Sequence, residues 1–430
     1  MSNAFHSISL ENIKLNEFKI RMLADYSYLN IEKENEIICN LEYKANSKSD
    51  FEYAITNVGV VINKYVGESN ICIIPNEIDG KEVTIIANRA FYNSTIKTVI
   101  LPASVTHIDE FAFYGCKNLT SITLPNGIAS IEPSTFAVCS KLIHITLPAS
   151  LTSIGEHAFN DCNSLVSISI PENVTSIGDY AFYNCGSLTS IVIPNHVTSI
   201  GASAFEECVN LKSITLSSDL TSIGEDAFFY CNNLTNVYYE GTIEDWCKIS
   251  FVDNDSNPMC KASHFYIRNS NNAWEEVTSI EISEAITEIG AYQFYSFNNV
   301  TSIQLPDTIT SIGDSAFYKC NNLKSIVIPN GVSSIGASAF SGCVSLTSIH
   351  IPAILTRIEA MTFSDCSNLN TIVIPNQVTY IGVKAFSGCS SLTNIIIPNS
   401  VTSMQANVFD KCYGIAIYCE APSKPDHWVS

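Results

Sequence analysis

The residues with the most versatile chemistry in this chain are sixteen cysteines and eight histidines. Thiolates act as nucleophiles and metal ligands, and histidine is the most frequent general base. The histidines are scattered without a common spacing, and the chain has no G-x-S-x-G elbow, no H-E-x-x-H, no Walker loop and no G-x-G-x-x-G. We therefore expect no catalytic residues, no enzyme activity and no bound cofactor.

One cysteine and histidine group has a spacing similar to that of a zinc site. Cys247, Cys260 and His264 form the pattern C-x₁₂-C-x₃-H. A structural zinc site needs four ligands at tight spacings, and the sequence offers no fourth ligand. The acidic loop at 253–258 lacks the spacing and the closing Glu of an EF-hand loop. We expect no metal site, and we interpret these cysteines as filler of an irregular segment.

Phenylalanine recurs every 23 residues, and this period defines the elements that position every other side chain. The first run is Phe113, Phe136, Phe159, Phe182, Phe205 and Phe228, and the second, after an interval of 66 residues, is Phe294, Phe317, Phe340, Phe363, Phe386 and Phe409. Phe91 precedes the first run by 22 residues. Such a repeat is typical of a solenoid, in which each unit packs only on its neighbours.

Most cysteines follow the same period. Eleven of them occupy one repeat position: Cys116, Cys139, Cys162, Cys185, Cys208, Cys231, Cys320, Cys343, Cys366, Cys389 and Cys412. A free cysteine packs as a small buried hydrophobe, so we expect an inward column of reduced thiols. Disulfides between adjacent coils and metal binding are the alternatives, because adjacent members could lie near the separation that a disulfide needs.

Residues 188–208 illustrate the expected coil. A β-branched stretch ended by Pro194 predicts a short strand, and 197–200 predicts a second extended piece. Phe205 and Cys208 are expected to point inward from a short helical or 3₁₀ turn. One unit cannot bury its own apolar edge, so neighbouring strands are expected to pair in parallel. The expected fold class is an α/β solenoid of 23-residue units.

The repeated pattern I-P-x-x-V-T-S-I-G-x-x-A-F-x-x-C-x-x-L-x-S-I strongly resembles the BspA-like leucine-rich repeats of the Treponema pallidum type, over about residues 51–425. The resemblance implies a leucine-rich repeat array with a β-rich N-terminal cap, in which Phe51-Glu-Tyr53 and Val60-Val-Ile62 belong to a capping hairpin. It also implies an extracellular or cell-surface bacterial protein, associated with adhesion and host-protein binding, and it implies no catalytic activity.

The period also divides the chain into segments. We expect an N-terminal segment with a helical cap at 1–50, a capping hairpin at 51–90, the first half of the array at 91–240, an irregular insertion at 241–276, the second half at 277–412, and a C-terminal cap or tail at 413–430. The helical expectation comes from the apolar spacing between Leu10 and Leu29. Within the insertion, Thr242 begins a predicted short helix, and 264–267 and 276–282 predict strands. The insertion is either an alternative form of the repeat or a binding face.

The charge and hydropathy of the chain exclude some classes of binding partner. The net charge of −20 argues against nucleic acid, because phosphate binding needs clustered Lys and Arg. No apolar run approaches the roughly 20 residues that cross a bilayer, so we expect no membrane span. The first residues lack the pattern of a secretion signal, which decides nothing about the compartment. We expect a protein partner, a host extracellular or matrix protein, and a monomeric chain.

The outward side chains of the first strand of each unit form the candidate interaction surface. Its two rows consist of small uncharged or apolar residues, without a Lys, Arg, Asp or Glu among those assigned to them, and uncharged flat sheets are easily desolvated. The candidate residues are Val192, Tyr238, Gln304, Val327, His350, Val373 and Ile396. The alternative is that Ser, Thr and Val only suit strand positions.

Two functions therefore remain open at the level of sequence. The first is an extracellular scaffold that binds a host protein or matrix through this sheet face. The second is an architectural or self-associating repeat module without a dedicated host ligand.

Overall fold

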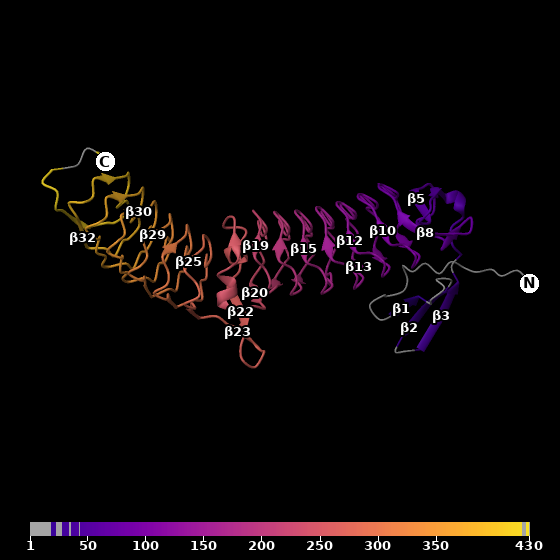
Figure 1. The fold of residues 1–430 in the computed structure, drawn as a ribbon, viewed down its shortest axis with the longest axis horizontal. Coiled ribbons are helices and arrows are strands. Elements are labelled where there is room, and N and C mark those ends of the chain that lie inside the picture. The colour runs from indigo at the N-terminus through magenta and orange to yellow at the C-terminus, as the bar shows by residue number, and fades with distance from the viewer. Residues whose placement is uncertain (1–18, 23–27, 34–35, 43, 424–426, 430) are drawn as a thin grey trace, which may run out of the picture.

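The computed structural model describes residues 19–22, 28–33, 36–42, 44–423 and 427–429. From the capping segment to the C-terminal end, the chain winds into one elongated array of stacked coils, which forms a shallow arc with a bend beside β25 (Figure 1). Each regular coil contributes a first strand, a second strand and a turn segment, and equivalent parts of successive coils lie side by side. The solenoid prediction is confirmed, with nearly no helix.

The first strands are three or four residues long. They are β6 (Ile71–Ile73), β9 (Thr98–Ile100), β11 (Ser121–Thr123), β13 (His144–Thr146), β16 (Ser190–Val192), β18 (Ser213–Leu216), β20 (Asn236–Tyr239), β24 (Ser279–Glu281), β26 (Ser302–Gln304), β28 (Ser325–Val327), β32 (Asn394–Ile397) and β34 (Ala416–Cys419). Every described pair among them is parallel and in register; Ile191 of β16, for example, lies opposite Ile214 of β18. The constant period keeps each central side chain on the buried face.

The second strands are shorter and pair in parallel in sheets separate from those of the first strands, with breaks between β10 and β12, β21 and β25, and β29 and β30 among the described strands. They are β10 (His107–Ile108), β12 (Ser130–Ile131), β14 (Ser153–Ile154), β15 (Ser176–Ile177), β17 (Ser199–Ile200), β19 (Ser222–Ile223), β21 (Ser250–Phe251), β25 (Glu288–Ile289), β27 (Ser311–Ile312), β29 (Ser334–Ile335), β30 (Arg357–Ile358), β31 (Tyr380–Ile381), β33 (Ser403–Met404) and β35 (His427–Trp428). The threonine before a second strand commonly donates its hydroxyl to the previous coil; Thr221 Oγ1, for example, lies 3.0 Å from the Thr198 carbonyl.

The turn segments are not helical, so the α/β label and the helical or 3₁₀ turns predicted for each coil are wrong. Tyr180 and Asn184 have φ values of 54° and 52°, in the left-handed region, which breaks any helix. The N–H groups of Tyr180, Phe182 and Asn184 donate to carbonyls of the next coil, whereas the N–H groups between them close turns within their own coil. This side of the solenoid is therefore a third hydrogen-bonded ladder.

The helical cap predicted for the N-terminal segment is also wrong where the structure describes it. Strands β1 (Lys19–Met22), β2 (Tyr28–Lys33) and β3 (Glu36–Glu42) form a small antiparallel sheet. The rest of the interval from Leu10 to Leu29 lies outside the described residues.

An antiparallel hairpin lies at the place where the capping hairpin is predicted. A 3₁₀ turn at Lys48–Asp50 leads into β4 (Phe51–Ile55), which pairs antiparallel with β5 (Val60–Tyr65). After β7 (Glu77–Ile78), β8 (Lys81–Ile86) pairs in parallel with β5 and with β10, and β6 pairs with β9. The ladders therefore begin before residue 91.

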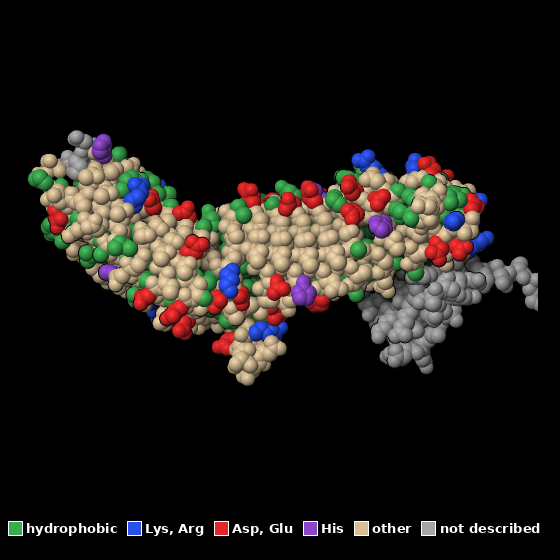
Figure 2. Space-filling view, in the orientation of Figure 1, with side chains coloured by type: hydrophobic (Ala, Val, Ile, Leu, Met, Phe, Trp, Pro, Cys, Tyr) green, Lys and Arg blue, Asp and Glu red, His purple; other side chains and the backbone are tan. Residues whose placement is uncertain are grey.

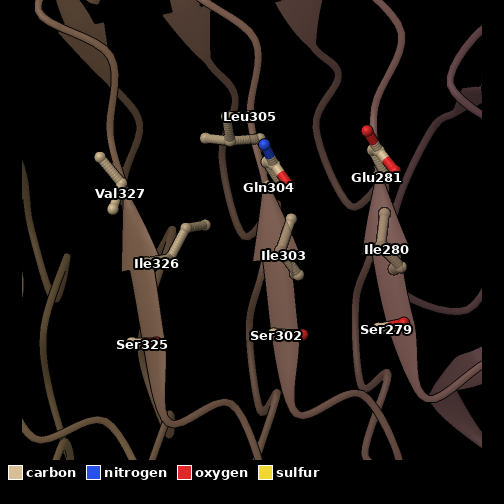
Figure 3. A pocket seen from close by; sticks show the side chains of 10 residues that line it. All are labelled: Ser279, Ile280, Glu281, Ser302, Ile303, Gln304, Leu305, Ser325, Ile326 and Val327. Atoms are coloured by element: carbon tan, nitrogen blue, oxygen red, sulfur yellow. The ribbon is translucent and has the colours of Figure 1, made fainter.

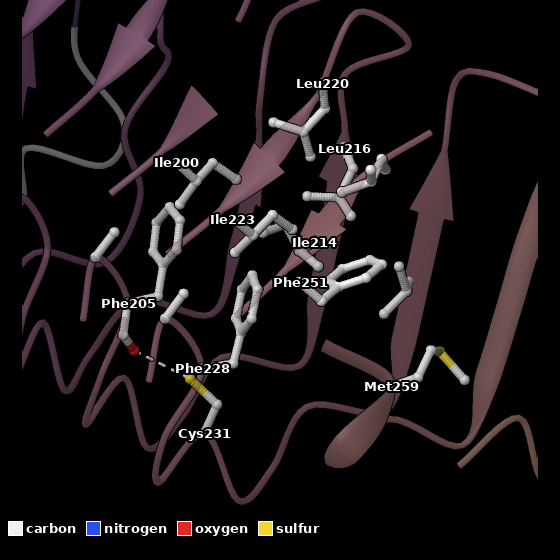
Figure 4. Close-up of a cluster of buried hydrophobic side chains, with 14 of the residues drawn as sticks. Ile200, Phe205, Ile214, Leu216, Leu220, Ile223, Phe228, Cys231, Phe251 and Met259 are labelled. Atoms are coloured by element: carbon white, nitrogen blue, oxygen red, sulfur yellow. Dashed lines mark hydrogen bonds between the residues drawn. The ribbon is translucent and has the colours of Figure 1, made fainter. Parts of the chain in front are cut away.

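The periodic phenylalanines form two stacks along the core. Successive rings of the first run lie 4.9–5.7 Å apart from Phe91 to Phe228, and those of the second run lie 5.2–5.8 Å apart from Phe294 to Phe409. The planes are nearly parallel, as in the pair Phe205 and Phe228 in Figure 4. Each interior ring is covered on both faces, so water is excluded from the column.

The cysteine column is buried and reduced, and its thiols do more than fill space. Each ladder thiol donates a hydrogen bond to the carbonyl of a periodic phenylalanine one coil earlier; the Cys231 thiol, for example, lies 3.0 Å from the Phe205 carbonyl (Figure 4). A coil thus links to its neighbour through a sulfur donor inside the core. Among the cysteines between residues 44 and 423, only Cys419 is exposed.

This column makes the stability of the fold sensitive to alkaline pH. Burial raises the thiol pKa from 9.0 to about 12 at Cys208, Cys320 and Cys366. Above pH 9, thiols of the unfolded chain ionise while those of the folded chain stay protonated. The contribution of each buried thiol to the free energy of unfolding is therefore fully present below pH 9 and is lost as the pH rises through the pKa of the folded state. We expect the free energy of unfolding, measured by urea denaturation, to fall between about pH 8 and about pH 10, with a slope above pH 9 of up to ~1.4 kcal/mol per thiol and pH unit. A Cys208→Val/Cys320→Val variant should show a smaller fall; an unchanged pH dependence would contradict the assignment.

The insertion begins as a longer coil and ends as a hairpin. The predicted helix is confirmed as α1 (Ile243–Trp246), with Thr242 as its N-cap, and β21 continues the second-strand ladder. After a 3₁₀ turn at Pro258–Cys260, β22 (His264–Arg268) pairs with β20 and with the antiparallel β23 (Trp274–Glu276). The hairpin tip projects from the body in Figure 1. Up to β22, the insertion is an alternative repeat.

Side chains join the two halves of the array where the strand ladders stop. Neither β21 nor β23 pairs with a strand of the second half among the described residues. Instead, the indole N–H of Trp246 donates to the Gln293 carbonyl at 2.8 Å, and the Gln293 carboxamide donates back to the Trp246 carbonyl. Asn257 adds a hydrogen bond to the Tyr292 carbonyl at 2.8 Å. Phe297, at a ladder cysteine position, packs edge-on against Trp246.

The C-terminal segment extends both ladders by one coil. Strand β35 pairs with β33, and Trp428 donates to the Val401 carbonyl at 3.2 Å, which covers the second-strand side of this end. Strand β34 pairs only with β32 among the described strands, and all four of its residues are exposed. Within the part of the chain that the structure describes, no strand covers the first-strand side of this end.

Candidate interaction face

The candidate site is the outward surface of the first strands, which we call the first-strand face. A strand directs alternate side chains to opposite sides, so the residue on each side of a buried central isoleucine points to solvent. Strands β16, β26 and β28 each have an exposed–buried–exposed pattern. Because the ladder is in register, the outward residues of successive coils form rows along the array.

The structure places the predicted residues in one of these rows, at equivalent positions. Val192 continues through Thr215 to Tyr238, and Gln304 lies opposite Val327. Ser348 bridges Thr371 in parallel, which brings His350 and Val373 to equivalent positions two residues further along their coils. Ile396 lies opposite Tyr418 of β34, a neighbour that the sequence rows did not include.

The aliphatic members of the row are unusually exposed. Val192, Val327, Val373 and Ile396 are 60%, 73%, 76% and 55% exposed. A hollow of about 540 Å³ includes His350 and Val373 in its lining, together with Ala353 and Pro375. A second hollow, of about 580 Å³, lies over β24, β26 and β28. Among the described residues, no Lys, Arg, Asp or Glu lines the first hollow, so its apolar groups can be desolvated without displacing a charge there.

One expectation about the row is wrong, because the row does contain a charge. Strand β24 pairs with β26 so that Glu281 lies opposite Gln304, and Glu281 is exposed (Figure 3). The rows predicted from the sequence did not include Glu281, because this residue lies in the interval where the phenylalanine period is broken. The in-register spacing of 23 residues before Gln304 was the signal that could have identified it.

The centre of the face carries an aromatic cluster of which only Tyr238 was predicted. Tyr238 stacks on Tyr266 at 4.8 Å and contacts Trp274 at 5.0 Å. Arg268 lies over the Trp274 ring at 4.0 Å, and its guanidinium binds both carboxylate oxygens of Glu240. The hydrogen bond to Glu240 raises the pKa of Arg268. These contacts hold the hairpin against the sheet.

Next to this cluster, a polar group fixes the base of the hairpin. His264 Nδ1 lies 2.6 Å from Glu276 Oε1, and Asn299 contacts both side chains. The hydrogen bond from His264 is the main reason that the pKa of Glu276 is lowered. His264 is thus engaged with Glu276, and the structure does not bring Cys247, Cys260 and His264 together as a ligand group.

A different set of acids does converge, at the start of the insertion. Carboxylate oxygens of Glu225, Asp226 and Asp253 lie within 4.8 Å of one another. Burial, followed by the charge of Asp253, raises the pKa of Asp226. Asp253 already accepts the backbone N–H groups of Asp226, at 3.1 Å, and Ser256, at 2.6 Å. These bonds explain how the loop is held.

Charge is unevenly distributed over the molecule. Figure 2 shows a wide area of uncharged polar side chains over the coils between β12 and β19, with acidic side chains along its edge. The serines and threonines of the repeat account for this pattern, since in the unit at 188–208 the acids Glu206 and Glu207 fall in the turn segment. The sheet surfaces are therefore uncharged over most of their length.

Stacked coils with in-register parallel strands and an inward phenylalanine column define a leucine-rich-repeat solenoid. More specifically, the chain belongs to the BspA type leucine rich repeat family. The sequence pattern of this family, a region of six repeat copies, matches residues 60–185, 130–257, 175–285 and 287–416. This family gives no indication of a catalytic activity.

Solved structures to which the chain is similar come from several bacteria. The chain is 27% identical to a leucine rich cell surface protein from Faecalibacterium prausnitzii, with 88% of this chain and 95% of that chain covered and a TM-score of 0.50. It is 32% identical to the T. pallidum leucine rich repeat protein over 45% of this chain and 81% of that chain, with a TM-score of 0.36. A Bacteroides ovatus leucine-rich repeat protein is 23% identical over 89% of this chain and 98% of that chain, with a TM-score of 0.48.

No curated protein matches the chain. Within the described part of the chain, no helix has the length and apolar character that a bilayer crossing requires.

Proposed function

We propose that the chain is a non-enzymatic protein-binding scaffold of the bacterial cell surface or exterior, which engages a host extracellular or matrix protein through the first-strand face. The observation that carries this proposal is the row of exposed aliphatic side chains that ends in Val327, Val373 and Ile396. Exposed apolar groups on a rigid sheet with few charges are the usual centre of a protein interface. The likeness to a cell surface protein of Faecalibacterium prausnitzii supports the location.

A double substitution tests the face directly. Val373→Asp with Ile396→Asp introduces two charges into the row while leaving every buried contact in place. We expect binding to fall at least about tenfold, because a buried unpaired carboxylate costs more than 1.4 kcal/mol. The measurement is binding to a panel of immobilised matrix proteins, with circular dichroism to establish folding.

Two other exposed valines provide the matched control. Val209 and Val344 lie outside the first-strand face and are 41% and 37% exposed. Val209→Asp with Val344→Asp adds the same charge and should leave binding unchanged. Equal binding by both double variants would remove the first-strand face from the proposal.

A second candidate function is self-association through the array end. It is favoured by β34, where Ile417 occupies the position of the buried Ile395 but is 44% exposed, and where the outer strand edge has no described partner. Open edges and uncovered apolar ends are common sites of chain-to-chain pairing. Light scattering over a range of protein concentrations distinguishes this function, because it requires a mass that increases with concentration.

A further inference from the structure

The first-strand sheet has a free edge within the array as well as at its end. Strand β24 pairs with β26 and with no other described strand, because the chain reaches it from the hairpin instead of from a regular coil. The Thr278 carbonyl accepts a hydrogen bond from the Thr301 N–H, and the Ile282 N–H donates one to the Gln304 carbonyl. Since alternate residues of a strand face opposite edges, the N–H and C=O groups of Ser279 and Glu281 point away from β26.

A hollow and a concentration of acids accompany this edge. The hollow over β24, β26 and β28 is lined by Ser279, Glu281, Gln304 and Val327, whose positions on neighbouring strands are visible in Figure 3. Residues 262–318 contain seven acidic side chains and a single basic one, Arg268, which is held by Glu240. Glu281, in the edge strand itself, and Glu275, in β23, are both exposed.

We infer that the free edge of β24 binds an extended peptide with Lys or Arg side chains, which adds to the sheet as an extra strand. The backbone groups of Ser279 and Glu281 supply the directional hydrogen bonds, as in other cases of strand addition. The acids favour basic side chains along the peptide. This inference rests on the proposed function, because it assigns a class of partner to the same face.

The probe is a fluorescein-labelled, terminally blocked peptide of alternating Lys and Val, and the readout is fluorescence anisotropy with the full chain. A Lys and Pro peptide of equal charge is the essential control, because the chain carries a net charge of −20 and attracts any polycation. The control peptide has two prolines between successive lysines, so most of its residues lack the N–H that a ladder bond needs. We expect the Lys and Val peptide to bind at least about tenfold more tightly than the Lys and Pro peptide.

Two variants locate the binding. Ser279→Pro removes an outward N–H without touching the bonds to β26, and Glu281→Lys reverses the charge beside it; each should weaken the Lys and Val peptide about tenfold. Glu172→Lys changes the net charge equally at an exposed position far along the chain and should have no effect. If Ser279→Pro loses its native circular dichroism, Glu281→Lys alone decides the outcome.

The result separates this inference from the proposed function. Equal binding of the two peptides, or unchanged binding by Glu281→Lys, overturns the strand-addition inference. The double variant at Val373 and Ile396 leaves the β24 edge intact, so it should still bind the peptide even when it no longer binds a matrix protein.

Discussion

Replacing Phe182 with alanine is expected to lower the free energy of unfolding by about 3–5 kcal/mol. The ring is fully buried and lies 5.3 Å from Phe159 and 5.4 Å from Phe205, so its removal opens a cavity between two coils and uncovers one face of each neighbour. A repeat array is stabilised mainly by contacts between adjacent units, so this substitution weakens the interfaces on which the stability of the fold depends. Urea denaturation followed by circular dichroism measures the change.

The control for this prediction is an aromatic residue two positions away. Tyr180 lies in the same turn segment but is only partly buried, with His157 stacked on it at 4.7 Å. Tyr180→Ala should therefore cost no more than about 1 kcal/mol. A Phe182→Ala variant as stable as Tyr180→Ala would contradict a stack that supports the fold.

Replacing Trp246 with alanine is expected to uncouple the two halves of the array. Trp246 is fully buried, and with Gln293 it provides the hydrogen bonds that replace the interrupted ladders. Removing it creates a large cavity and leaves the Gln293 carbonyl without its indole donor, a loss of about 3–5 kcal/mol at this one interface. Since coupling in such arrays passes only between neighbours, unfolding should separate into two transitions. Urea titration followed by circular dichroism detects them.

Two further substitutions show whether the ring or the hydrogen bond matters. Trp246→Phe keeps most of the packing and removes the donor, so we expect a loss of about 1–2 kcal/mol and a single transition. Trp274→Ala removes a partly exposed indole from the hairpin and should leave cooperativity intact. A single transition with an unchanged midpoint in Trp246→Ala would refute the role assigned to this junction.

The sequence was sufficient to predict the solenoid, its strands and the burial of its columns. A strict period forces equivalent residues into equivalent places, so the inward positions of Phe182, Phe205 and Cys208 followed directly. The outward positions of Val327 and Val373 followed from alternation within a strand.

The remaining features depend on information that residue types do not carry. The spacing of Ala204, Phe205 and Cys208 suits a helical turn, but the left-handed φ values at Ser203 and Glu207 break it, and neither residue type announces such a conformation. Glu281 and Trp274 escaped assignment because the period fails around them. A thiol donor and an apolar filler are also indistinguishable in sequence, so the bonds of the cysteine column became visible only in three dimensions.

The direction of the backbone hydrogen bonds has a mechanical consequence. Bonds between coils run along the long axis, so a pull on the two ends would stretch them lengthwise, interface by interface, and coils would peel away singly. Each freed coil of 23 residues would add about 80 Å of slack in place of the roughly 4.8 Å it occupied. The array would thus lengthen under load, while the coils that stay folded would still present the first-strand face.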